Sequence, residues 1–393
     1  DGRLVLSTNF GLLVSGDGSR WHWICEGVTG LGTELYRVGA DGTVYAASLH
    51  SGLRRGGAPD ACGWERGGGT LEGASLSDVL PDPSRAERVF AIARPLLPDQ
   101  SNGALGLYVS SDGGRTFGPP LLEVPANEDL TSMEVAPSDP RTIYVTKTVV
   151  GSPVYPALLR STDGGANWTT VDLRSVLGHR LVRVAAVDAV DPRRLYLRVT
   201  DLATTTNPDT LVISDDGGAT FRSPKRADGS PLRLGYAMSA FLRRADGSLL
   251  IGVSRVQAAH PLYRSTDEGH TFEPVPGAPH VRALAERAGV LYAAADDITD
   301  GYAVASSTDG GATWTPLLRF AGICGPLRCG DIPSTCAAEW DDLRITVGIP
   351  EDPCGEEPAS SKGCGCALGS GDLGAGALLL GLGLWMRRRR RRR

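Results

Sequence analysis

The chain has 393 residues, 41% hydrophobic and 22% charged, a composition typical of globular proteins and not of disordered ones. The formal net charge is −5, although seven of the 40 Lys and Arg residues form the run 387–393. The rest of the chain is therefore acidic, which argues against nucleic-acid binding, since that binding depends on neutralising phosphates. With 51 Gly and 26 Pro among many Val, Leu and Thr, the composition favours strands joined by tight turns and an all-β class.

An eight-residue motif recurs along the chain. It reads Ser, any residue, Asp, any residue, Gly, any residue, Thr or Asn, then Trp or Phe, at 110–117, 161–168, 214–221, 265–272 and 307–314. A shortened copy ends at Trp21, and a Cys-bearing segment ends at Trp64. The acids and closing aromatics are Asp17, Asp112, Asp163, Asp216, Asp267 and Asp309, with Trp21, Trp64, Phe117, Trp168, Phe221, Phe272 and Trp314. Their spacing of about 42 to 53 residues predicts seven four-stranded propeller blades.

Each copy is preceded by a short apolar run such as GTVYAAS or RTIYVTK, and a further run separates one copy from the next. These runs alternate or are continuously apolar, as half-buried or central strands are, and they complete four strands per repeat. The chain begins at the second strand of the first blade. We expect the segment 338–349 to supply the missing strand, so that Asp1–Ser7 and Leu343–Ile349 share a blade and leave no open edge.

The residue types of the motif suit a self-satisfied turn. The Asp carboxylate accepts backbone N–H groups, Gly permits a positive φ, and the aromatic packs into the blade. A calcium loop would need several oxygen ligands at alternating positions, whereas STDGGANW offers one carboxylate. The sequence therefore predicts no metal site and no cofactor.

These motifs resemble the BNR or Asp-box repeat of sialidases, sortilin-type receptors, some glycoside hydrolases and photosystem assembly factors. The resemblance implies that function lies on the face opposite the motifs, on the loops between the second and third strands of each blade. Plain solvent-exposed connections are the alternative interpretation of these loops. Their candidate binding residues are Asp99, Asn102, Tyr155, Asp201, Asn207, Asp296 and Asp297.

No catalytic residue is predicted. A sialidase resemblance would imply three Arg, a Tyr and Glu pair and an Asp acid, but the expected Arg-Ile-Pro segment is missing from the start of the chain. Asp296 and Asp297 would serve as acid and base only with a partner carboxylate about 5 to 9.5 Å away. The HExxH, P-loop, GxSxG and dinucleotide patterns are also missing. We expect a non-enzymatic binding module for a protein or a glycan, with a glycoside hydrolase of sialidase or related type as the alternative.

The eight Cys favour disulfides in an oxidising compartment over zinc, because no two CxxC pairs stand at zinc-ribbon spacing. A Cys25–Cys62 bridge and two bridges among Cys324, Cys329, Cys336 and Cys354 are plausible pairings that the sequence leaves open.

After the propeller, expected over 1–350, the chain changes character. A Cys-, Gly- and Pro-rich linker over 351–366 is followed by an apolar segment, 367–386, and then by the Arg run 387–393. The apolar segment is predicted to be a short transmembrane helix with a cytoplasmic Arg anchor. The order CGC, apolar segment, Arg cluster is similar to the myxobacterial C-terminal sorting signal. That resemblance implies export, processing or lipid attachment at Cys364 and Cys366, and display at the cell surface or outer membrane; an ordinary tail anchor is the alternative.

Overall fold

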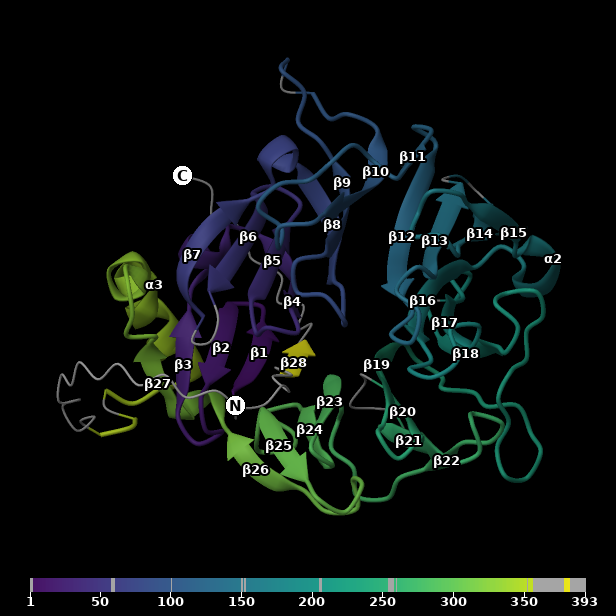
Figure 1. Cartoon of the computed structure of the whole chain (residues 1–393). Helices are drawn as coiled ribbons and strands as arrows, with labels where there is room; N and C mark the ends of the chain where they lie inside the picture. Colours follow the sequence, from purple (N-terminus) through teal and green to yellow (C-terminus); the bar gives the residue numbers. More distant parts are fainter. Residues whose placement is uncertain are drawn as a thin grey trace, which may run out of the picture.

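The computed structural model describes residues 3–57, 61–99, 101–149, 151, 153–204, 207–253, 258, 260–351, 353–355 and 378–381. Seven β-sheets stand around a common centre and form a ring (Figure 1). Each sheet is one blade of a seven-bladed β-propeller, so the predicted all-β class and blade number are confirmed. The first blade is discussed separately because its strands come from both ends of the chain.

Blades two to seven follow one another along the chain, and their first strand lies innermost. Their strands are β4 (Thr33–Val38), β5 (Val44–Ser48), β6 (Gly52–Gly57), β7 (Cys62–Gly67); β8 (Ser75–Pro81), β9 (Val89–Arg94), β10 (Leu105–Ser110), β11 (Leu122–Val124); β12 (Glu128–Val135), β13 (Ile143–Val149), β14 (Tyr155–Ser161), β15 (Thr169–Asp172); β16 (Leu181–Val187), β17 (Leu195–Thr200), β18 (Asp209–Ser214); β19 (Met238–Arg243), β20 (Leu249–Val253), β21 (Leu262–Ser265), β22 (Glu273–Pro274); β23 (Ala283–Arg287), β24 (Val290–Ala294), β25 (Val304–Ser307), β26 (Thr315–Leu318). Among the described residues, the fifth blade has three strands, and an isolated bridge between Ile213 and Arg222 stands where its fourth would begin.

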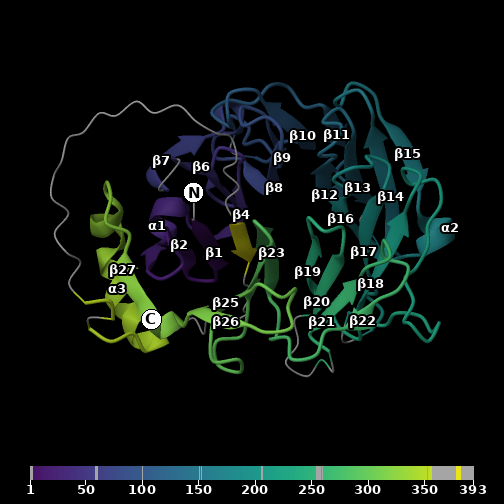
Figure 2. The same cartoon turned by 60° about the horizontal axis from the view of Figure 1, so that its bottom comes forward.

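Short helical segments occupy several connections. They are α1 (Glu26–Thr29), η1 (Gly69–Leu71), α2 (Arg174–Leu177) and η2 (Phe320–Gly322). All four lie where the chain passes from the last strand of one blade to the next blade or, for η2, towards the ring closure (Figure 2). They therefore belong to the face opposite the repeated motifs.

The core lies between blades. Four second strands carry an aromatic at their second position, and all four are buried: Tyr45, Phe90, Tyr144 and Tyr196. The Tyr45 hydroxyl donates to the carbonyl of Gly113, and that of Tyr144 donates to the carbonyl of Pro192, each in the next blade. Buried tyrosines need such a partner for the hydroxyl, so these residues both pack and fix neighbouring blades.

The first blade closes the ring in a way that the sequence did not predict. Its order is β27 (Ile323–Pro326), β3 (Trp21–Ile24), β2 (Gly11–Ser15), β1 (Leu4–Thr8) and β28 (Leu378–Gly381). The strand β28 holds the innermost position that we expected Leu343–Ile349 to fill, and β27 adds a fifth strand at the outer edge, parallel to β3. The prediction that Leu343–Ile349 would pair within this blade is wrong.

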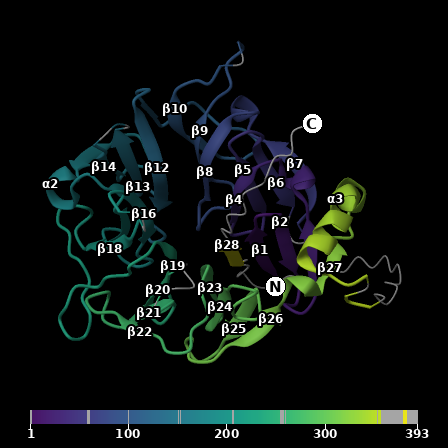
Figure 3. The same cartoon turned by 180° about the vertical axis from the view of Figure 1, so that it is seen from behind.

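Residues 332–347 form the helix α3 (Ile332–Val347), which lies beside the first blade (Figure 3). Ile332, Cys336 and Leu343 are buried on one side of it, a helical and not a strand period. The helix ends at Gly348, whose left-handed φ of 78° lets its N–H reach the carbonyl of Arg344. Trp340 packs against Trp23 of β3 with ring centroids 5.8 Å apart, which holds α3 on the blade.

Three disulfides tie this closing region to the ring. Cys25 bonds Cys336, Cys62 bonds Cys329, and Cys324 bonds Cys354. The expected Cys25–Cys62 pairing is wrong, because each of these residues faces the segment around α3 instead of the other. The Cys324–Cys354 bridge is one of the pairings that the sequence left open.

The predicted transmembrane helix over 367–386 is not found in the described part of that segment. Residues 378–381 form the strand β28, parallel to β1. Among the described residues, no helix is both long and apolar enough to cross a bilayer. Cys364, Cys366 and the Arg run 387–393 lie outside the described residues.

The two long-range disulfides should be strongly non-additive. Cys25–Cys336 spans 311 residues and Cys62–Cys329 spans 267, so each closes only a short extra loop while the other is present. Replacing both pairs by Ser should lower the free energy of unfolding by about 2 kcal/mol more than the sum of the two single-pair losses, by chain-entropy scaling. Denaturant unfolding of the three variants and the parent measures this; additive losses would contradict it.

Candidate functional site

The six complete or shortened motifs form turns with the same hydrogen bonds. In the fourth blade, the Ser161 hydroxyl donates to Asp163 Oδ1 at 2.8 Å and accepts the N–H of Gly165 at 2.8 Å. The same carboxylate accepts the backbone N–H and side-chain amide of Asn167, at 2.9 and 2.7 Å. Equivalent bonds occur around Asp112, Asp216, Asp267 and Asp309, and a shorter set surrounds Asp17.

These turns also connect to the rest of the ring. In three blades the Gly after the motif Asp donates its N–H to the preceding strand connection: Gly113 to Glu87, Gly164 to Arg141 and Gly217 to Arg193, at 2.7 to 2.8 Å. A Cβ at Gly217 would lie 2.5 Å from Arg160 Nη1 of the preceding blade. The polar atoms of the turns are thus engaged within the protein, which leaves the carboxylates few free lone pairs for a ligand.

The seventh predicted copy, in the second blade, differs. Trp64 lies within β7 and donates its indole N–H to the carbonyl of Ala61, at 2.7 Å. Cys62 of the same strand is bound to Cys329. A disulfide to the closing region stands here in place of the Asp-centred turn.

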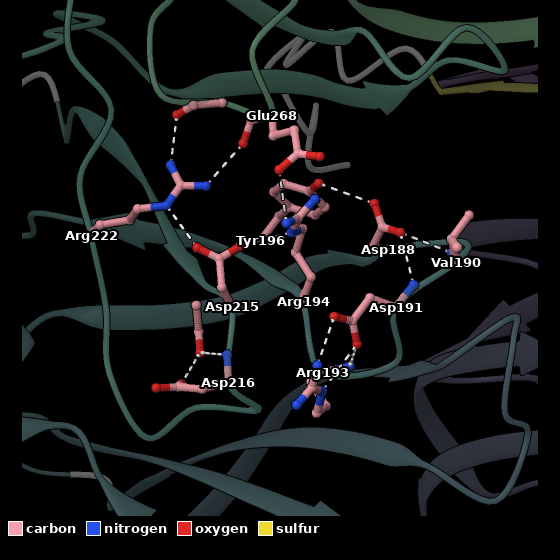
Figure 4. Close-up of polar contacts among 12 residues, drawn as sticks. Asp188, Val190, Asp191, Arg193, Arg194, Tyr196, Asp215, Asp216, Arg222 and Glu268 are labelled. Carbon is pink, nitrogen blue, oxygen red and sulfur yellow. Dashed lines mark hydrogen bonds and ion pairs between the residues drawn. The ribbon is translucent and has the colours of Figure 1, made fainter.

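The junction of the fifth and sixth blades carries an extended polar network on the motif face (Figure 4). Arg194 binds Asp215 at 2.7 Å and Glu268 at 2.9 Å, and Arg222 binds the other oxygen of Asp215 at 2.8 Å. Arg222 also donates to the carbonyls of Gly269 and Glu268. Two arginines of the fifth blade are therefore fixed on a motif turn of the sixth.

Asp188 anchors the inner part of the same network. Its carboxylate accepts the N–H groups of Val190 and Asp191, at 2.8 and 3.0 Å, and pairs with Arg243 of the next blade at 2.5 Å. Burial alone would raise its pKa, but these N–H groups and the guanidinium outweigh burial and hold the pKa of Asp188 below its usual value. The group is a buried, ionised connector.

Glu268 occupies a motif position that is Gly in four of the other copies. Its φ is 58°, the left-handed region that costs a residue with a Cβ of the order of 1 kcal/mol. The strain persists because the Glu268 carboxylate and carbonyl hold Arg194 and Arg222. The sequence contained this signal, a Glu within a run of motif glycines.

A cavity of about 240 Å³ adjoins this network, lined among others by Asp188, Arg194, Arg243, Asp246 and Glu268. Its volume suits a small polar molecule. However, the arginines that would attract an anion are already bound to Asp188, Asp215 and Glu268. The cavity is better explained as a gap beside a blade-to-blade clamp than as a ligand site.

The predicted binding residues lie on the opposite face, as their loops require, but most stabilise their own turns. Asp99 accepts the N–H and hydroxyl of Ser101, and Asp201 accepts the N–H of Ala203. Asn102 forms a bridge with Leu96, and Asn207 adopts a positive φ of 42°. These residues shape the loops and are not brought together at one point.

Asp296 and Asp297 do not form an acid and base pair. Asp296 is buried, binds Arg282 at 2.7 Å and accepts the N–H of Thr299. Asp300 accepts the N–H of Asp296 and pairs with His280 at 2.8 Å. Burial raises the pKa of Asp297. The loop 296–301 is held by its own carboxylates, so its conformation is fixed.

Tyr155 lies in a small aromatic and basic cluster. His179 meets its ring edge-on, with centroids 5.2 Å apart, and the Arg174 guanidinium lies 5.4 Å from the ring centre. Arg174 is also bound to Asp172. The Arg174 and His179 side chains are exposed, and Tyr155 is half-buried.

Most of the exposed large apolar side chains lie on this same face. Of eight exposed large hydrophobic residues in the described chain, six lie in connections of the face opposite the motifs: Leu31, Leu96, Leu97, Val176, Leu202 and Ile298. Val190 lies on the motif face and Ile345 on α3. Ile298 is 94% exposed at the tip of its loop. The candidate binding residues predicted from the sequence are mostly polar, and they do not include the exposed apolar residues of the same loops.

A second group that sequence analysis missed lies on the innermost strands of four consecutive blades. Arg37 and Asp78 approach to 3.6 Å, and the charges of Glu134 and Arg183 act on the same pair. Burial raises the pKa of Glu134 to about 8, against the opposing effect of Arg37. The four side chains form a cluster of ionisable groups on the innermost strands, and Asp78 and Arg183 are the single charged residues of β8 and β16. Among the described residues, no three His, Cys, Asp or Glu side chains are placed to hold a metal ion.

No protein-family model and no curated protein matches the chain. Among solved structures, a puromycin hydrolase is similar with a TM-score of 0.53 at 13% identity, over 80% of this chain and 51% of that one. YCF48 bound to D1 peptide gives 0.41 at 16% identity, over 65% and 69%, and a xyloglucanase from Xanthomonas campestris gives 0.37 at 16%, over 80% and 56%. At these identities the similarity shows the propeller fold alone. The chain spans about half the length of the hydrolase and of the xyloglucanase.

The strain at Glu268 can be measured with two substitutions. Glu268→Gly should be about 1 kcal/mol more stable than Glu268→Ala, because both remove the ion pair with Arg194 but only Ala retains a Cβ in the left-handed region. Denaturant unfolding gives the difference. Gly310→Ala, at the same motif position in the next blade with φ 75°, is the matched control and should lose a similar amount. Equal stability of the two Glu268 variants would contradict a retained left-handed backbone.

The lowered pKa of the motif carboxylates predicts that the folded protein loses stability in acid. Burial alone would raise the pKa of Asp267, but bonds from the Thr271 hydroxyl and N–H and the Ser265 hydroxyl lower it from 3.8 to about 2. The stabilisation that comes with a lowered folded-state pKa is fully present above about pH 4 and is lost as the pH falls from about 4 towards 2. Asp267→Asn should therefore be less stable at neutral pH and show a shallower loss over that window. Urea midpoints from pH 6 to 2 test this, with Asp341→Asn on α3 as control; unchanged steepness in Asp267→Asn would contradict it.

Proposed function

We propose that this chain is an exported, surface-displayed β-propeller that binds a protein or glycan through the face opposite the motifs, without turning it over. The observation that carries the proposal is the concentration of exposed apolar side chains on that face. Single exposed apolar groups need no explanation, but the presence of six of the eight on one face of the ring favours that face as the interaction surface. The motif face is a poorer candidate for binding, since its carboxylates are already bound within their own turns or to arginines.

A protein partner is favoured over a glycan. Leu31, Leu96, Leu97, Val176, Leu202 and Ile298 are all aliphatic. Aliphatic side chains gain free energy by excluding water from another apolar surface, whereas sugar rings are bound mainly through stacking and hydrogen bonds. Tyr155 and His179 are the residues that would contact a glycan. Binding on the glycan array described below would support that alternative.

Export and display are supported by the disulfides and the C-terminal sequence. Three disulfides suit an oxidising compartment and not a reducing cytosol. The order of CGC, apolar segment and Arg cluster supports anchoring or processing near Cys364 and Cys366. Mass spectrometry of the chain recovered from the producing cell would show whether it ends near these residues.

The binding face is tested with charge substitutions at the loop tips. We expect Leu202→Asp and Ile298→Asp each to weaken binding at least about tenfold, since a carboxylate would have to be desolvated in the interface. The full-length protein is applied to an array of extended peptides and to an array of glycans including sialosides. Val190→Asp, also exposed but on the motif face, is the control and should bind as the parent does. Equal effects of all three variants, or no binding on either array, would contradict the proposed face.

A glycoside hydrolase is the second candidate, favoured by one observation. Asp78 and Glu134 are two carboxyls with raised pKa on neighbouring innermost strands, beside Arg37 and Arg183. A protonated carboxyl beside a second acid is the arrangement from which acid catalysis of glycoside cleavage proceeds. If fluorogenic glycosides are hydrolysed, Glu134→Gln should abolish turnover while leaving peptide binding unchanged. Turnover that survives this substitution would reject the assignment of Glu134.

A further inference from the structure

A second cavity of about 240 Å³ lies where the turn at residues 9–10 meets the helices α1 and α3. That turn joins β1 to β2, the second and third strands of the first blade, and therefore lies on the face opposite the motifs. Figure 2 shows α1 and α3 side by side next to this blade. The cavity thus belongs to the face of the proposed partner site, at the point where the closing helix packs on the ring.

Three carboxylates line the cavity from two separate helices. Glu339 and Asp342 lie three residues apart on one side of α3, and Glu26 begins α1. Among the described ion pairs, α3 makes the one between Arg344 and Asp341, and no Lys or Arg is paired with the three lining carboxylates. The cavity on the motif face is different, because its carboxylates are already bound to arginines. Like charges that line one cavity repel one another, so an entering cation lowers the electrostatic free energy of this one.

Apolar side chains form another part of the wall. Phe10, Trp23 and Leu343 line the cavity, and the last two are buried. The indole N–H of Trp23 donates to the carbonyl of Phe10 at 2.8 Å, and the Phe10 ring meets Phe320 edge-on with centroids 5.4 Å apart. The turn at residues 9–10 is therefore fixed on the blade.

This combination of walls distinguishes between kinds of cation. A bare metal ion needs several oxygen ligands around one point, and no three acidic, His or Cys side chains of the described residues are placed to hold one. A Lys or Arg side chain instead lays its methylene stem on an apolar wall and presents several N–H donors to carboxylates spread around it. Aromatic rings add an attraction for the cationic head.

The two helices that carry the carboxylates are joined covalently. Cys25, next to Glu26, is bonded to Cys336, three residues before Glu339. A Cβ at Gly27 would lie 3.6 Å from Glu339 Oε1, so α1 and α3 are in contact at this point. A site whose walls are fixed before binding loses little conformational entropy when it is filled.

We propose that this cavity receives a single Lys or Arg side chain of the protein partner. Its volume suits one side chain, since pockets for drug-sized ligands enclose about 300–1,000 Å³. The proposal rests on the proposed partner face and specifies the partner's chemistry. The exposed aliphatic residues of that face exclude water, and the acidic cavity selects a basic residue and orients the contact.

The test uses tripeptide probes and does not require the partner. N-acetylated, C-amidated Ala-Lys-Ala and Ala-Arg-Ala are titrated into the millimolar range against the full-length protein with isotope-labelled Trp indoles. Both should move the Trp23 N–H resonance saturably and leave that of Trp314, in the seventh blade, unmoved. The same peptide with norleucine in place of Lys keeps the stem without the charge, and its effect should be at least about tenfold smaller. No shift of Trp23, or equal shifts with Lys and norleucine, would overturn the proposal.

Charge substitutions assign the binding to the cavity. Glu339→Gln combined with Asp342→Asn removes two lining charges with little change in side-chain size, and should weaken binding of Ala-Lys-Ala at least about tenfold. Asp341→Asn combined with Glu351→Gln makes the same change in charge at exposed positions that do not line the cavity, and should bind as the parent does. Equal losses in the two double variants would mean attraction by the overall charge, and would overturn the proposal.

The peptide array separates this proposal from the partner face. Peptides bound by the parent should contain Lys or Arg, and the variant with Glu339→Gln and Asp342→Asn should bind them at least about tenfold more weakly. Tripeptide binding with no binding on the array would contradict the partner face alone. Array binding without an effect of the tripeptides on Trp23 would contradict the cavity alone.

Discussion

Ring closure is the constraint on which the rest of the structure depends. A ring of sheets is closed when each blade packs against both of its neighbours, and blades two to seven are each built from one continuous stretch of chain. In the first blade the outer strand β27 and the inner strand β28 come from after the seventh blade. The helix α3 and the disulfides Cys25–Cys336 and Cys62–Cys329 then hold that region in place. The irregular features of the molecule are concentrated where closure has to be achieved.

Contacts between blades explain why the motif face is unsuited to ligands. The motif carboxylates are saturated by their own turn, the motif glycines admit arginines from the preceding blade, and the one Glu in place of a Gly binds Arg194 instead. The charged groups on this face are therefore many, but they are bound to other residues of the motif face, several of them in neighbouring blades. Opposite it, the aliphatic side chains of the connections, such as Leu202 and Ile298, are exposed to solvent. The two faces therefore differ in chemistry, with bound charged groups on one and exposed aliphatic side chains on the other.

Much of this was predictable from the sequence, and the failures have physical causes. Spacing of Trp168, Phe221 and Phe272 fixed the blades, because the repeat encodes local hydrogen bonds that each copy makes for itself. The closing region has no repeat to follow. The need to close the first blade predicts a strand over 343–349, but burial of Ile332, Cys336 and Leu343 along one side makes the segment helical. Disulfide pairing and the charged cluster of Arg37, Asp78 and Glu134 depend on distances between blades, which the sequence does not contain.

Contacts with the rest of the ring also decide the conformation of residues 378–381 in the C-terminal segment. Its composition favours a membrane helix when it is considered alone, because twenty residues with one charge satisfy their own backbone in that conformation. Beside the ring it meets an edge of β1 that offers the missing hydrogen-bond partners directly, and residues 378–381 are extended there. An apolar segment takes whichever backbone conformation its surroundings can complete. Residues 378–381 take the strand conformation beside β1, where the backbone of that strand completes their hydrogen bonds.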